Sequence, residues 1–166
     1  MAPTSEEVRE LLGEPQAIDL DLVDVESALL RAAVGDYAVE AAVLLLANAG
    51  SWLPQLHAAG LVTLALDGDA DGGPWAAVQW ADLDGALRSG AIRGNGGELR
   101  LLRAAAGLAD GQPVDLADLT AGLDREQLTL LLAALAHAAG SHEHPDEESP
   151  DPYRVLGPVL AWPVRD

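Results

Sequence analysis

The chain has 166 residues, of which 49% are hydrophobic, and its 27 Asp and Glu residues outnumber nine Arg residues for a formal net charge of −18 at pH 7. This acidity argues against direct binding to nucleic acid or anionic membranes, because those partners attract basic side chains. The chain contains no Cys, which excludes disulfides, thiolate nucleophiles and Cys-ligated metals.

Residues 1–16 form an acidic N-terminal arm interrupted by Gly13 and Pro15. The arm has neither a basic start nor an apolar run, so no secretory signal is expected. The longest apolar run, residues 41–47, is far shorter than the roughly 20 residues of a membrane-spanning helix. A cytoplasmic protein that does not bind membranes is therefore expected.

Apolar residues at helical spacing predict helices over residues 24–34, 37–49 and 51–59. The second of these is bounded by Asp36 as an N-cap and Gly50 as a stop. It is apolar on nearly every side, which predicts that it lies at the centre of the core.

A β-hairpin is predicted over residues 61–80, with strands at 61–66 and 75–80 around a turn rich in Asp and Gly. Because side chains alternate along a strand, one face should pack on the helices. Trp75 and Gln79 fall on the opposite face, and Trp75 is the aromatic residue expected to be partly exposed.

The C-terminal half returns to helix, with predicted helices over residues 82–88, 95–109, 115–122 and 124–140. Asn95 and Glu98 have the spacing of a capping box. In the last helix, an apolar stripe at 3.6-residue spacing is formed by Leu128, Leu131, Leu132, Leu135 and Ala139.

These elements predict an α+β fold that is mostly α, a compact helical domain over residues 17–140 with one antiparallel hairpin. Residues 141–152, with five acids and three Pro, predict an acidic flexible linker without fixed structure. Residues 153–166 are an apolar, Pro-containing segment that docks on its own domain or on a partner. Docking on its own domain is favoured, because a free apolar tail promotes aggregation.

Several short motifs between residues 36 and 140 are similar to those of a group of small, functionally uncharacterised actinobacterial proteins. They are Glu40-Ala-Ala-Val-Leu-Leu-Leu, Trp52-Leu53, Val78-Gln-Trp80, Gly97-Glu98, Leu101-Leu-Arg-Ala-Ala-Ala, Gly111-Gln-Pro-Val-Asp-Leu116 and Gly122-Leu-Asp124. The resemblance implies one compact unit and transfers no activity.

The sharpest local motif is Asp67-x-Asp69-x-Asp71-Gly, which resembles the first half of a calcium-binding loop. Val78 stands where such a loop places its bidentate Glu, so an EF-hand is not predicted. A simpler Ca²⁺ or Mg²⁺ site and a plain solvated turn both remain open. No other cofactor is predicted, since His142 and His144 lie on the segment expected to be flexible.

No catalytic residue is predicted. The Ser residues lack a nucleophile elbow, and the Gly-rich stretch 94–97 lacks the Lys of a phosphate-binding loop. Glu40 is expected at the edge of the core with its carboxylate in water. Arg93, Arg100 and Arg103 form a basic stretch, for which pairing with nearby acids is favoured over an anion site.

The leading functional hypothesis is a non-enzymatic interaction module for an unknown protein partner, with self-association left open. The predicted contact residues lie on the hairpin and the C-terminal segment: Trp75, Gln79, Leu156, Leu160 and Trp162. One alternative is a metal-binding or metal-sensing protein that uses Asp67, Asp69 and Asp71. Another is an acidic mimic of nucleic acid that inhibits a DNA-binding protein.

Overall fold

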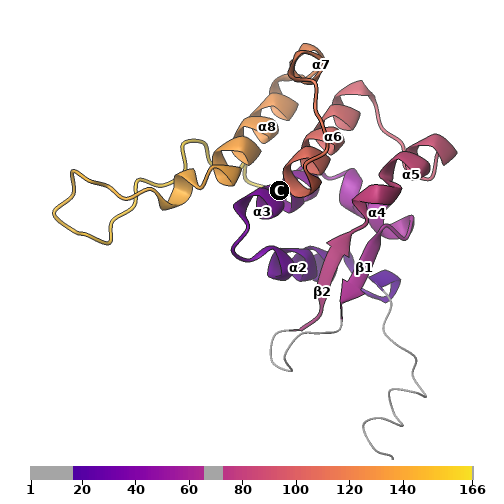
Figure 1. The fold of residues 1–166 in the computed structure, drawn as a ribbon, viewed down its shortest axis with the longest axis horizontal. Helices are drawn as coiled ribbons and strands as arrows, with labels where there is room; N and C mark the ends of the chain where they lie inside the picture. The colour runs from indigo at the N-terminus through magenta and orange to yellow at the C-terminus, as the bar shows by residue number, and fades with distance from the viewer. Residues whose placement is uncertain (1–16, 66–72, 166) are drawn as a thin grey trace, which may run out of the picture.

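The computed structural model describes residues 17–65 and 73–165 (Figure 1). Within these residues the fold is mostly α with one antiparallel pair of strands, which confirms the predicted α+β class. In chain order the elements are η1 (Ala17–Asp19), α2 (Leu22–Ala33), α3 (Tyr37–Ala49), α4 (Trp52–Ala58), β1 (Val62–Ala65), β2 (Trp75–Val78), η2 (Trp80–Asp82), α5 (Leu83–Ser89), α6 (Gly96–Asp110), α7 (Leu116–Ala121), α8 (Arg125–Ala138) and η3 (Ser141–Glu143).

Side-chain caps set the starts of the longer helices. Asp36 accepts hydrogen bonds from two backbone N–H groups of α3, as its position before the apolar run predicts. Complete capping boxes open two further helices, Asn95 with Glu98 in α6 and Asp124 with Gln127 in α8. Local sequence therefore determines where these helices begin.

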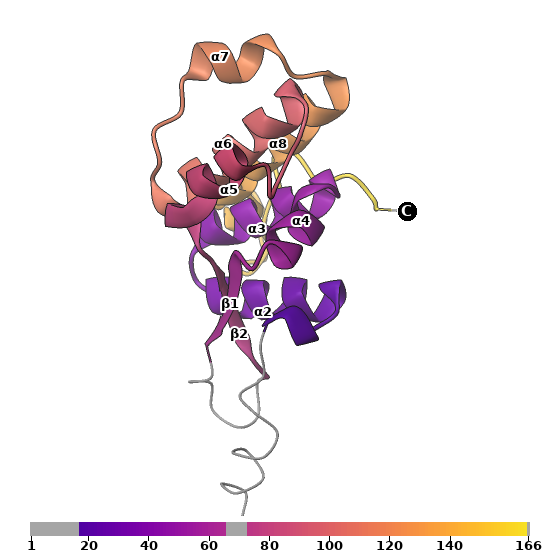
Figure 2. The same cartoon turned by 90° about the vertical axis from the view of Figure 1, so that its right-hand side faces the viewer.

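Helix α3 lies at the centre of the molecule, as its apolar sequence predicts. It packs against α6 and α8, and α2 also contacts it. Ala41, Ala42, Leu45 and Leu46 of α3 are completely buried. Helix α2 also packs on β2. The hairpin and α7 lie at opposite ends of the described part of the molecule (Figure 2).

The hairpin has the predicted faces. The strands pair in a register that joins Val62 to Val78 and Ala65 to Trp75. Val62 and Ala76 are buried, whereas Trp75 is 44% exposed on the other face. Residue 80 begins a 3-10 helix instead of extending the strand.

Helix α8 faces the core with a side that helical spacing alone does not identify. Leu130 and Leu131 are buried, together with Ala133 and Ala134. Four of the five members of the predicted apolar stripe are exposed instead: Ala139 and the three leucines Leu128, Leu132 and Leu135, which are 41%, 46% and 47% exposed.

Residues 141–152, for which a flexible linker is predicted, contain local structure. Residues 141–143 form η3, and an isolated antiparallel bridge joins Pro145 to Val155. The N–H of Leu156 also donates to the carbonyl of His144 at 2.9 Å. Residues 144–156 thus form a hydrogen-bonded loop that projects away from the helices (Figure 1).

The chain beyond this loop returns to its own domain, as the preferred mode of docking predicts. Trp162 packs against the core, and the N–H of Val159 donates to Ser141 Oγ at 3.2 Å. Two nitrogens of Arg165 donate to the Glu26 carboxylate on α2, at 2.7 and 2.9 Å. These bonds raise the pKa of the Arg165 guanidinium.

Candidate interaction surface

The predicted contact residues on the hairpin lie at opposite ends of β2, and α2 supports the end that carries Trp75. Two guanidinium nitrogens of Arg31 donate to the carbonyl of Pro74, at 3.0 and 3.1 Å. Trp75 follows directly and stays partly exposed, and Gln79 Nε2 donates to Thr63 Oγ1 at 2.7 Å. Trp75 is therefore an apolar group displayed on a supported strand.

The predicted contact residues of the C-terminal segment do not share one environment. Leu156 is exposed on the projecting loop, whereas Leu160 and Trp162 are half-buried. Because the loop and the hairpin lie in different parts of the molecule (Figure 1), Leu156 and Trp75 belong to two separate surfaces.

A third apolar surface lies on α8, where the sequence indicated an apolar stripe that was not interpreted as a contact surface. The leucine face, defined here as Leu128, Leu132, Leu135 and Ala139, is exposed along its whole length. Its spacing of four, three and four residues matches the a and d positions of a heptad. That spacing was a usable sequence signal, because it marks a seam that can pack against another helix.

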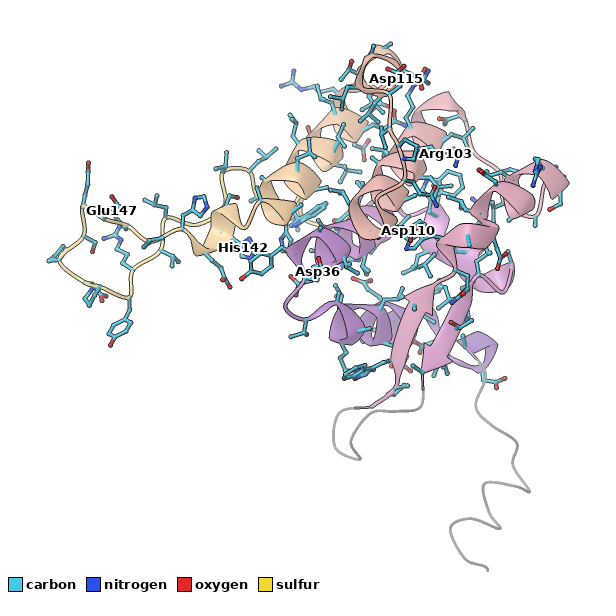
Figure 3. All side chains as sticks on the ribbon, viewed as in Figure 1. Asp36, Arg103, Asp110, Asp115, His142 and Glu147 are labelled. Carbon is cyan, nitrogen blue, oxygen red and sulfur yellow. The ribbon has the colours of Figure 1, made fainter. Side chains whose placement is uncertain are left out.

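A cluster of polar and aromatic side chains lies where α3, α8 and η3 meet the C-terminal segment, close to His142 in Figure 3. Glu40 does not simply extend into water, as was expected, because its carboxylate lies 3.1 Å from His137 Nε2. The side chains of Glu40 and His137 are only 21% and 17% exposed. The imidazole of His137 stacks on that of His142, with ring centres 4.4 Å apart.

The cluster also includes Tyr37 of α3, Glu143 of η3 and Trp162 of the C-terminal segment. The Tyr37 hydroxyl donates to the Glu143 carboxylate, and this bond raises the pKa of Tyr37. Trp162 lies with its ring centre 6.2 Å from that of His137. His142 Nδ1 and Trp162 Nε1 are buried without a hydrogen-bond partner in the described structure. The cluster therefore holds the C-terminal segment mainly through ring contacts.

Two of the three arginines of the basic stretch, Arg100 and Arg103 of α6, pair with acids as the sequence favoured, whereas Arg93 Nε donates to the carbonyl of Gly90 at 2.9 Å. Arg100 and Arg103 line a groove of about 460 Å³ beside residues 113–119. Arg100 binds Asp118 at 2.8 Å and Arg103 binds Asp84 at 2.7 Å. These carboxylates neutralise the two guanidinium groups, so the groove is not strongly positive.

The predicted metal ligands Asp67, Asp69 and Asp71 lie outside the described residues. Among residues 17–65 and 73–165, no three His, Cys, Asp or Glu side chains are grouped so as to hold a metal ion. No helix in this part of the chain is both long enough and apolar enough to cross a membrane. No family model, curated protein or solved structure matches the chain.

Proposed function

We propose that the protein is a non-enzymatic interaction module that binds another protein through the leucine face of α8. The observation that carries the proposal is the exposure of Leu128, Leu132 and Leu135 on one side of a helix whose other side is buried. Single exposed leucines are ordinary on protein surfaces, but a continuous apolar stripe is typical of a binding site.

The leucine face is held in place by its own domain. Helix α8 packs on α3 through its buried side, and His137 near its end pairs with Glu40 of α3. The helix therefore cannot turn to bury its leucines without breaking these contacts. A partner that covers the three half-exposed leucines would gain about 1 kcal/mol from each, since full burial contributes roughly 1.5–3 kcal/mol.

The test is affinity capture from the native host with the full-length protein and with a Leu132→Gln, Leu135→Gln double variant. Gln favours helix nearly as well as Leu, so α8 should keep its helicity, which circular dichroism checks. A matched control is Val23→Gln, which changes an exposed apolar residue of α2. A partner that wild type and V23Q retain but the double variant loses is the expected result.

Two results would contradict the proposal. One is that the double variant captures the same proteins as wild type in the same amounts. The other is turnover of a metabolite by the purified protein, because an active site would replace the non-enzymatic assignment.

A further inference from the structure

We infer that the occupant of the leucine face is a cationic amphipathic helix of another protein. This inference rests on the proposed function and adds the chemistry of the partner. It combines the spacing of the exposed leucines with the charges at the two ends of α8.

The apolar part of the partner follows from the spacing. Leu128 and Ala139 are 11 residues apart in sequence, which corresponds to about 16 Å along a helix. A second helix covers such a stripe with apolar residues at the same alternation of three and four. A partner in extended conformation would instead hydrogen-bond to unpaired backbone groups, and the backbone groups in the middle of a helix are already paired.

The charge of the partner follows from what surrounds the stripe. Between residues 127 and 139 the only titratable side chain is His137, which turns to Glu40 on α3. Beyond the N-terminal end of the stripe, the exposed Asp124, Arg125 and Glu126 carry a net charge of −1, because two carboxylates outnumber one guanidinium. Beyond its C-terminal end, the exposed Glu147 and Glu148 lie on the projecting loop, where Figure 3 labels Glu147. A partner with Lys or Arg beside its apolar stripe would pair with these acids.

A second copy of this chain fits the same surface poorly. Each copy carries a net charge of −18, so two copies repel one another. An antiparallel pair of α8 helices would bring residues 124–126 of one copy, whose net charge is −1, toward the acidic loop of the other, so no net attraction is gained there. The leucine face is also smaller than the roughly 800 Å² that each partner buries in a stable interface. Binding at this face therefore needs attraction between opposite charges as well, which two copies of the same acidic chain do not supply.

The experiment measures binding of a labelled synthetic peptide to the full-length protein by fluorescence anisotropy. The peptide is a helix of about 18 residues, long enough to span the stripe, with Leu at its a and d positions and Lys or Arg beside them. A scrambled peptide of identical composition has the same charge but no apolar stripe. V23Q again serves as the control variant.

The designed peptide should bind wild type and V23Q equally and the scrambled peptide much more weakly. Leu132→Gln with Leu135→Gln should weaken binding about tenfold or more, since losing about 1 kcal/mol at each of two sites exceeds the 1.4 kcal/mol of one decade. Glu147→Gln with Glu148→Gln should weaken binding about threefold in low salt and leave it unchanged at about 0.5 M salt, where exposed charges are screened.

The inference is overturned if the scrambled peptide binds as tightly as the designed one, because attraction would then depend on charge alone. It is also overturned if light scattering shows a wild-type dimer that the leucine double variant loses, because the occupant would then be a second copy. A host protein that depends on the leucine face but is captured equally in low and high salt would leave the interaction function standing and refute the cationic partner.

Discussion

The contact between Trp52 and Gly94 allows a quantitative test of how α4 is fixed to the start of α6. Trp52 is completely buried, and its Nε1 donates to the carbonyl of Glu98 at 3.0 Å. A Cβ atom on residue 94 would lie 2.7 Å from two carbons of the indole, Cζ2 and Cη2. Both carbons belong to the outer ring, which Phe lacks.

Gly94→Ala should therefore destabilise wild type by about 1–3 kcal/mol, the usual cost of overpacking a core. Trp52→Phe should cost about 2–3 kcal/mol, of which about 1 kcal/mol is the lost hydrogen bond and the rest is the space left by the smaller ring. In the Trp52→Phe background the clash with the indole disappears. Adding Gly94→Ala there should cost at least about 1 kcal/mol less than in wild type, a coupling typical of residues in contact.

The assay is urea denaturation followed by far-UV circular dichroism, because the substitution of Trp52 alters fluorescence. The control is Gly85→Ala on α5, where an added Cβ would meet no atom within 4 Å. Its effect should be neutral or stabilising by up to about 1 kcal/mol, since Ala favours helix more than Gly. An equal cost of Gly94→Ala in both backgrounds would refute the packing argument.

Three further predictions concern the helix contacts and the C-terminal segment. The hydrogen bond to Glu143 raises the pKa of Tyr37 above 10.0. The bond therefore stabilises the fold below pH 10, and this stabilisation is lost as the pH rises through the raised pKa. Glu143→Gln should return the midpoint of the Tyr37 ultraviolet titration toward 10.0. Trp162→Ala should speed amide exchange in the C-terminal segment about tenfold or more without changing exchange in α8, and unchanged exchange would refute the docking role of the indole. Gly97→Ala would place Cβ 2.1 Å from Gln127 Oε1, so the flexible Gln127 side chain should move away and lose its capping hydrogen bond from Asp124 N, at a cost of about 1 kcal/mol or less by urea unfolding. An equal cost in a Gln127→Ala background, where that bond is already absent, would contradict this account.

The features that the sequence predicted well are those that local residues determine. The helix predicted over residues 37–49 has the observed bounds of α3, because Asp36 and Gly50 act within one turn of its ends. The capping box at Asn95 and the outward face of Trp75 also depend on near neighbours or on the alternation along a strand.

The features that sequence reasoning missed depend on contacts between distant residues. Glu40 and His137 are 97 positions apart, so their pairing follows from how α3 and α8 pack and not from any local pattern. The stack of His137 on His142, only five positions further along, depends on the local turn after α8. No spacing rule could have placed these three side chains together.

The orientation of α8 links this packing to the proposed function. Helices α3 and α8 pack against each other, and the buried residues of α8 are Leu130, Leu131, Ala133 and Ala134. Small side chains let two helix backbones approach closely, so this contact is satisfied without the larger Leu132 and Leu135. The exposed leucines of α8 are therefore not needed for packing within the domain, which leaves them available for the partner helix proposed above.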